Sequence, residues 1–286
     1  MTEELRNSPL TPRWRTILIR RHSVVTRLTH WLNVLCLGVL LLSGLQIFNA
    51  YPQLHWGQYG ADADPAFLKI GASESNGEPH GFITIGSSVT VSTTGVLGLS
   101  KTGGEWTTRA FPAWLTLPPY QDLAAGRRWH FFFAWIFVVN GLVYLGYGFL
   151  SHHFRRDLVP QRSELVPRHL WREIVDHARL RFPKGEKARR YNALQKLTYI
   201  AVIAALLPLM VLTGLTMSPG VDAAFPVLLD IFGGRQSART LHFITASLLV
   251  AFVAVHVAMV VLSGPWNTMR SMITGRYAIR QEGPDA

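Results

Sequence analysis

The stretch "LHFITASLLVAFVAVH", residues 241–256, is apolar along most of its length but carries a histidine near each end. His242 and His256 are 14 residues apart. In a helix this spacing puts them about 21 Å apart along the axis and about 40° apart around it. One helix therefore presents one imidazole at each of two levels, both toward the same neighbouring helices.

Four apolar runs of this kind occur in the 286 residues, and none contains Asp, Glu, Lys or Arg. They lie at residues 30–48, 130–150, 197–217 and 241–262. Each is close to the ~20 residues that a helix needs to cross a bilayer. The sequence therefore predicts an all-α membrane protein, with a four-helix transmembrane bundle over residues 30–262.

The basic residues are unevenly distributed. Of 28 Lys and Arg, 21 fall in residues 1–29, in 151–196 and after 262, whereas seven fall in 49–128 and 217–239. The positive-inside rule then places both termini and the 151–193 connection in the cytoplasm, and residues 49–126 on the outer side. Topology and contact with anionic membrane lipid account for the net charge of +11, so we do not expect nucleic-acid binding.

The segments outside the helices have distinct characters. Residues 1–29 and 263–286 form a cytoplasmic lead-in and a cytoplasmic tail. In the long outer (periplasmic) loop, 49–126, "HGFITIGSSVTVSTTGVLGLS" alternates apolar and polar residues and indicates a short β-hairpin, the alternative being a disordered polar loop. In the inner loop, 151–193, the pattern after Pro167 predicts an amphipathic helix on the inner leaflet.

Histidine carries whatever redox chemistry the chain has. Cys36 is the only cysteine, which excludes intrachain disulfides, cysteine-bound iron–sulfur clusters and covalent haem attachment through C-x-x-C-H. His30 begins the first run at the level of His256, and His130 begins the second at the level of His242. One such histidine alone is explained equally well by an interhelical hydrogen bond or a proton relay. Two pairs facing each other favour six-coordinate haem iron, and the lack of nearby carboxylates disfavours zinc.

Short sequence echoes accompany the histidines. Arg127 and Arg239 each precede a His-Phe pair by three residues, and Arg27 precedes His30 by three. These arginines would neutralise haem propionates or anchor the helices to lipid headgroups. "LLLSGLQIF" and "MVLTGLTMS" close the first and third runs, where Gly44 and Gly214 would admit a porphyrin or allow close helix packing.

With His30 in "RLTHWLN", His130 in "RRWHFFFAW" and the pair His242 and His256, the chain resembles the bacterial cytochrome b561 and Ni/Fe-hydrogenase b-type cytochrome family, over about residues 20–275. The resemblance implies two non-covalent b haems, the inner one held by His30 and His256 and the outer one by His130 and His242. It also implies a bacterial inner-membrane subunit that carries electrons between the quinone pool and a periplasmic oxidoreductase, either a molybdopterin enzyme or a hydrogenase.

The same resemblance implies a quinone site near the inner haem. Tyr191, Asn192 and Gln195 begin the third run there and could hydrogen-bond quinone carbonyls. The alternative is that Asn192 caps the helix and Tyr191 anchors it at the interface.

Two other functions compete with the electron conduit. One is a self-contained haem enzyme that acts on superoxide or ferric iron at the outer face. The other is a proton-coupled transporter that uses the histidines without haem.

Overall fold

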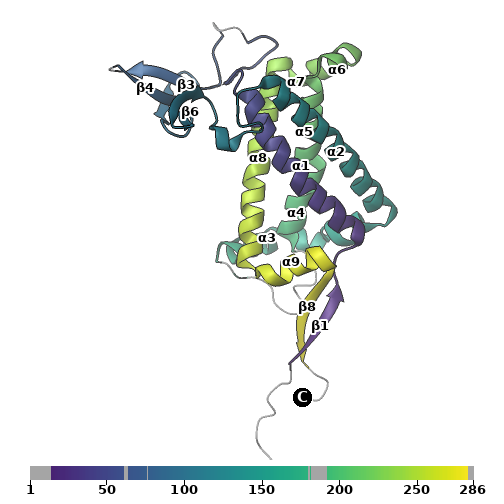
Figure 1. The fold of residues 1–286 in the computed structure, drawn as a ribbon. Helices are drawn as coiled ribbons and strands as arrows, with labels where there is room; N and C mark the ends of the chain where they lie inside the picture. Colours follow the sequence, from purple (N-terminus) through teal and green to yellow (C-terminus); the bar gives the residue numbers. More distant parts are fainter. Residues whose placement is uncertain (1–13, 61–63, 76, 180, 182–191, 283–286) are drawn as a thin grey trace, which may run out of the picture. The chain divides into compact units, whose positions relative to one another are not determined.

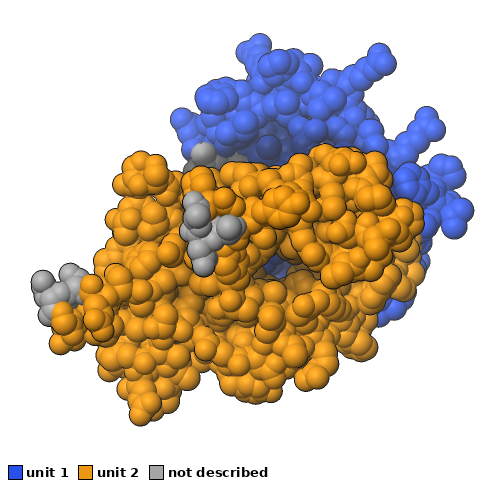
Figure 2. Space-filling view, turned by 90° about the horizontal axis from the view of Figure 1, so that it is seen from above, with its two compact units in different colours: residues 1–29, 144–201, 253–286 blue, residues 30–143, 202–252 orange. Residues whose placement is uncertain are grey.

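The computed structural model describes residues 14–60, 64–75, 77–179, 181 and 192–282. The chain divides into two compact units, coloured separately in Figure 2. Unit 1 comprises Met1–Thr29, Tyr144–Ala201 and Val253–Ala286, and unit 2 comprises His30–Val143 and Val202–Phe252. Each unit is described by itself below.

Four helical stretches are long and apolar enough to cross a membrane, as predicted (Figure 1). They are α1 (Val24–Phe48), α2 (Leu123–Leu150), the stretch Ala193–Thr216, and α8 (Arg235–Leu262). Three of them begin about two turns before the apolar run that predicted them, because polar and basic residues near a membrane surface continue a helix without cost. The chain is therefore mostly helical, with four candidate spans.

The third span is interrupted in the middle. It consists of α4 (Ala193–Ala201), a π-helical segment (Val202–Leu206) and α5 (Leu207–Thr216). Pro208 has no backbone N–H and its ring would collide with the carbonyl four residues earlier in a regular α-helix. A local π turn widens the helix at that point, so the span continues past the proline.

Residues 49–126 belong to unit 2 and contain more strands than the sequence predicted. The predicted hairpin is present as β4 (Glu78–Ile85) and β5 (Val89–Ser92). These strands extend a four-stranded antiparallel sheet with β2 (Gln53–Leu54) and β3 (Leu68–Ser75), while β6 (Gly98–Thr102) pairs with β7 (Glu105–Arg109). Gly98 has φ +77°, and a Cβ there would lie 2.0 Å from the Gly71 carbonyl oxygen, so only glycine allows β6 to approach β3 this closely.

An apolar core attaches this segment to the helices of unit 2. Phe48, Leu54, Ile70 and Ala110 are buried together, and Phe243 of α8 packs against them. The Phe48 and Phe243 rings are 4.9 Å apart. Two short helices, α6 (Pro219–Ala224) and α7 (Val227–Phe232), complete unit 2 between α5 and α8.

Unit 1 contains a two-stranded ribbon that the sequence analysis did not predict. Strand β1 (Trp14–Arg20) pairs antiparallel with β8 (Arg276–Glu282), with Ile17 opposite Ile279. Besides α4 and the ends of α1, α2 and α8, unit 1 contains α3 (Pro167–Ala178), which begins at the predicted proline, α9 (Pro265–Thr274), a 3-10 turn (Arg162–Leu165) and a π-helical turn (Phe154–Leu158). The lead-in and the tail of the chain are thus joined by backbone hydrogen bonds.

Candidate functional site

His130 of α2 and His242 of α8 face each other in unit 2. Their ring centroids are 6.3 Å apart and their planes are inclined by 62°. Two imidazoles that bind one metal ion have ring centres about 6 Å apart, given ~2 Å for each metal–nitrogen bond and ~1 Å from nitrogen to ring centre. The predicted outer pair is therefore close enough to share one ion.

Each imidazole is held by a hydroxyl from a neighbouring helix. His130 Nδ1 is 3.1 Å from Ser43 Oγ, and His242 Nδ1 is 3.0 Å from Thr213 Oγ1. Both hydroxyls donate their own hydrogen to a carbonyl one turn back, at 2.6 Å to Val39 and 2.7 Å to Leu209. The hydroxyls must then accept from the imidazoles, so Nδ1 carries the proton and Nε2 is left as the metal-binding atom.

A glycine follows each hydroxyl residue and lies against the same imidazole. A Cβ at Gly44 would be 3.3 Å from His130 Cε1, and a Cβ at Gly214 would be 3.3 Å from His242 Cε1. Any side chain at these positions would press on the ring edge formed by Cε1 and Nδ1. The echo between "SGL" in the first span and "TGL" in the third thus corresponds to two similar half-sites, one for each histidine.

The chemistry of this site fits haem better than zinc. Among the described residues there is no cluster of three or more His, Cys, Asp or Glu side chains that could form the four-ligand set of a structural zinc site. Two facing neutral imidazoles in apolar stretches of their helices are ligands that would suit a haem iron. His130 and His242 would hold such a haem, and the iron would supply a one-electron redox change.

The three predicted arginines all make protein contacts. Arg239 donates to the Tyr51 carbonyl and lies over the Phe48 and Tyr51 rings, at 5.5 and 5.1 Å from their centroids. Arg127 is exposed and lies 5.4 Å from the centroid of the Phe131 ring. Arg27, in unit 1, donates to the Ile273 carbonyl and so ties the start of α1 to α9.

Arg109 is a buried cation that the sequence analysis missed. Its guanidinium is 3% exposed and donates to the carbonyls of Phe111 and Pro119, to Thr116 Oγ1 and to Gln46 Oε1. Burial lowers the pKa of this guanidinium. A lone arginine at the end of a short strand gives no sequence signal of burial, because its partners come from distant segments.

The N-terminus of α8 is capped by the segment 51–60. The Gly57 carbonyl accepts from the backbone N–H groups of Gln236 and Ser237, both at 3.0 Å. Thr240 Oγ1 donates to the His55 carbonyl at 2.6 Å. These bonds satisfy N–H groups that a helix start leaves without partners, and they fix the outer end of the helix that carries His242.

The predicted inner residues are distributed between the two units. His30 lies in unit 2 and His256 in unit 1, so their pairing stays a prediction. Asn192 Oδ1 accepts from the Gln195 backbone N–H at 2.8 Å, and Gln195 Oε1 accepts from that of Asn192 at 3.4 Å. Asn192 and Gln195 thus form a reciprocal capping box. This is the arrangement expected if Asn192 caps the helix, the alternative to its binding quinone. Tyr191 lies outside the described residues.

Acidic side chains reinforce the start of α4 in unit 1. The Glu173 carboxylate accepts from the backbone N–H groups of Ala193 and Leu194, at 3.3 and 2.9 Å. Buried Lys196 pairs with Glu164 at 2.9 Å. Burial by itself raises the pKa of the Glu164 carboxyl, but the hydrogen bonds from Lys196 and the Gln161 backbone outweigh it and lower that pKa.

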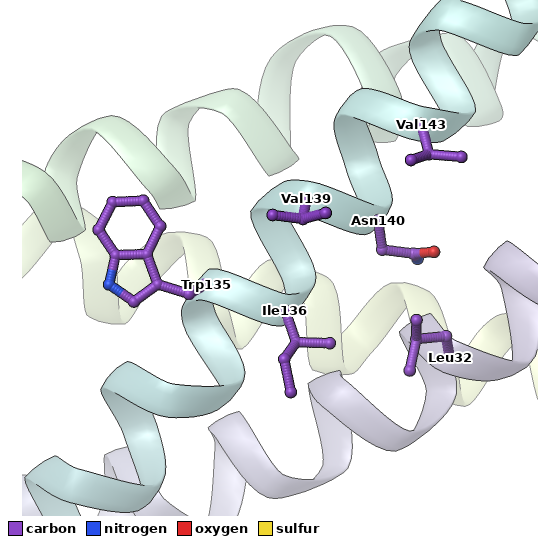
Figure 3. Close-up of a pocket in the computed structure, with 6 residues that line it drawn as sticks. All are labelled: Leu32, Trp135, Ile136, Val139, Asn140 and Val143. Atoms are coloured by element: carbon purple, nitrogen blue, oxygen red, sulfur yellow. The ribbon is translucent and has the colours of Figure 1, made fainter.

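A pocket of about 370 Å³ lies between α1 and α2 in unit 2 (Figure 3). Its lining is apolar except for one amide and consists of Leu32, Trp135, Ile136, Val139, Asn140 and Val143. Asn140 Nδ2 donates to Asn33 Oδ1 at 2.7 Å, which joins the two helices. Such a lining suits an acyl or isoprenoid chain and contributes no redox group.

Comparison with known proteins agrees with the geometry of the histidine site. The model of the prokaryotic cytochrome b561 family matches residues 21–275. A putative protein-methionine-sulfoxide reductase subunit, YedZ1, of Azospira oryzae is 30% identical over 254 residues, which cover 89% of this chain and 96% of the relative. No solved structure gives a significant match. The chain therefore belongs to the prokaryotic cytochrome b561 family and is a membrane haem b electron-transfer subunit that works with an oxidoreductase.

Proposed function

We propose that this subunit carries electrons across the bacterial inner membrane, between the quinone pool and a periplasmic oxidoreductase, through two b haems. The single observation that carries the proposal is the approach of His130 and His242 to 6.3 Å, with Nδ1 of each bound to a hydroxyl. Such a pair holds neutral, oriented imidazoles ready to bind iron. A proton relay would need imidazoles that exchange protons with water, which apolar burial and fixed tautomers disfavour.

The second haem of the proposal is bound by His30 and His256. His256 follows His242 by 14 residues on the continuous helix α8, so one helix supplies a ligand at each level. Two haems on one helix shorten each electron-transfer step across the apolar layer. Arg27, Arg127 and Arg239 lie one turn from His30, His130 and His242 respectively, and we assign them to the propionate edges.

The outer partner is an oxidoreductase of the molybdopterin or hydrogenase type, and the relative's name favours one that reduces methionine sulfoxide. Its docking surface would be the segment 49–126, which packs as folded strands on the helices of unit 2. The topology that goes with this assignment places both termini and α3 on the cytoplasmic side, following the basic residues. There α3 would lie on anionic lipid, with Trp171 and Ile174 exposed to it.

Quinone or quinol is the proposed partner in the membrane. Its site would be the start of α4, near Tyr191, Asn192 and Gln195. The carboxamides of Asn192 and Gln195 form a capping box, and we propose that the quinone carbonyl lies beside them.

A spectroscopic titration tests the proposal. The detergent-solubilised holoprotein should show the sharp reduced bands of bis-histidine b haem with dithionite, and pyridine haemochrome analysis should give two haems per chain. Decylubiquinol should reduce the same haems in membranes, or decylubiquinone should reoxidise them. A colourless protein would favour the transporter, and haems that react with superoxide or ferric chelates but not with quinone would favour the self-contained enzyme.

A further inference from the structure

A histidine–carboxylate dyad stands at the end of α2 in unit 1. His153 Nδ1 lies 2.7 Å from Asp157 Oδ2, and Arg156 donates to the same carboxylate at 3.1 Å. The Tyr144 and Tyr147 rings flank the imidazole, with centroids 6.3 and 6.0 Å away. The side chain of His153 is 15% exposed, so the group is shielded but within reach of water.

The backbone around the dyad is unusual. His152 has φ +56°, a left-handed conformation that residues other than glycine rarely adopt. The next residues, Phe154–Leu158, form a π-helical turn, a feature that is frequent at functional sites. A Cβ at Gly148 would lie 2.2 Å from the Phe154 ring, so a larger residue there would displace the ring that packs on α2. Several uncommon features together hold His153 between the two tyrosines.

The dyad lies on a turn that contacts α4, the helix at whose start we propose the quinone site. The π turn packs against α4, the helix that begins after Asn192, and both belong to unit 1. Tyr144 follows His130 by 14 residues on α2, the same spacing that separates His242 from His256 on α8. If the inner haem is at the level of His256, Tyr144 is at that level too.

The ionisable groups around His153 fix which ring nitrogen faces the carboxylate. Burial by itself raises the pKa of the Asp157 carboxyl, but the hydrogen bonds from Arg156 and His153 outweigh it and lower that pKa. The carboxylate is thus ionised and accepts from Nδ1, which leaves Nε2 as the atom that gains and loses a proton. The other ionisable side chains on the elements packed here are Tyr144 and Tyr147 on α2, Arg155 and Arg156 on the turn, and Lys196 and Tyr199 on α4.

We propose that His153, oriented by Asp157, is the proton acceptor and donor for the quinone reaction at the start of α4. The inference rests on the proposed function, since it assigns a role at the same quinone site. In quinol oxidation, the O–H bond breaks and a bond forms between that proton and Nε2, while one electron leaves to ferric haem. The imidazolium then passes the proton to water, and a second cycle removes the second proton and electron to give quinone. Quinone reduction runs through the same steps in reverse.

The test uses decylubiquinol as electron donor to the holoprotein in membranes, with haem reduction followed by absorbance. His153→Gln should slow this reduction by roughly 100-fold, the usual contribution of a positioned acid–base group. Its dithionite-reduced spectrum and haem content should match the unaltered protein. The matched control is His152→Asn, which removes the neighbouring exposed imidazole and still tolerates the left-handed backbone. This variant should keep the original rate.

A second variant gives a measurement that a structural role would not change. Asp157→Asn replaces the carboxylate that accepts from His153 Nδ1, so the imidazole is no longer held with Nε2 free to meet quinol. The kcat for decylubiquinol should fall, while the KM for decylubiquinol and the haem content stay unchanged. A rate within twofold of the original in His153→Gln, or an unchanged kcat in Asp157→Asn, overturns the proposal. If decylubiquinol fails to reduce the unaltered protein while dithionite succeeds, the quinone assignment itself falls, and this proposal falls with it.

Discussion

Two kinds of histidine occur in the two units of this protein. In unit 2, His130 and His242 donate from Nδ1 to the hydroxyls of Ser43 and Thr213. In unit 1, His153 and His169 pair with the carboxylates of Asp157 and Glu173, at 2.7 and 3.1 Å. Either kind of partner fixes the tautomer of its imidazole, and a metal-bound histidine often donates to a carboxylate. The pair of unit 2 also brings the ring centroids of two imidazoles to 6.3 Å from each other. The facing imidazole, rather than the partner, is therefore what suits His130 and His242 to share one metal ion.

The largest effect should come from removing one imidazole of unit 2. Under the proposed assignment, His242→Ala removes one of the two residues that would hold the outer haem, and His130 alone would not retain it. Pyridine haemochrome analysis should show about half the haem of the unaltered protein. His80→Ala, at an exposed strand position, is the control and should retain all of it. Full haem content in His242→Ala would show that His242 does not bind haem iron.

A smaller effect should follow from removing a hydroxyl partner. Thr213→Val keeps the shape of the side chain but deletes the acceptor for His242 Nδ1, so the ring loses its fixed tautomer. Loss of such a supporting contact typically weakens metal binding about 10-fold or more. The rate at which haem transfers to apomyoglobin measures how strongly each variant retains its haem. Thr213→Ser, which keeps the hydroxyl, should behave like the unaltered protein. Equal haem loss from the Val and Ser variants would show that the hydroxyl does not position the ligand.

The smallest effect concerns the charged side chains of unit 1. Glu164→Gln leaves Lys196, 8% exposed, without its carboxylate partner. The cost should be about 1 kcal/mol at pH 7, because the carboxyl is partly screened by water. Since the pKa of Glu164 is lowered in the folded protein, its contribution is present above the ordinary carboxyl pKa and is lost as the pH falls through the folded value.

Thermal unfolding in detergent measures this contribution. The variant should melt a few degrees lower at neutral pH, about 2–4 °C for a chain of this size, and the difference should vanish toward pH 3. Glu105→Gln, at an exposed strand position, should leave the melting temperature unchanged. A difference that persists at low pH would mean that packing, rather than the ion pair, carries the effect.

The approach of His130 to His242 could be predicted from the sequence, but their hydrogen-bond partners could not. The two histidines were identified because they lie at matching depths in apolar runs without charged residues. The partners Ser43 and Thr213 were not identified, because many serines and threonines lie in the spans and only packing decides which of them meet an imidazole. Arg109 was missed because its partners come from distant segments. The dyad His153–Asp157 is local, but no sequence pattern marks the π turn in which it lies.

The sequence by itself determined the four membrane-spanning helices, the spacing of His242 and His256 and the membership of the family. These properties depend on composition and on helix geometry within one segment, and both can be read locally. Only the tertiary structure decided the pairing of β1 with β8, the sheet built on the predicted hairpin and the hydroxyl that contacts each of the two facing imidazoles. Such contacts join residues far apart in the chain, and their free energy depends on which surfaces the folded helices bring together.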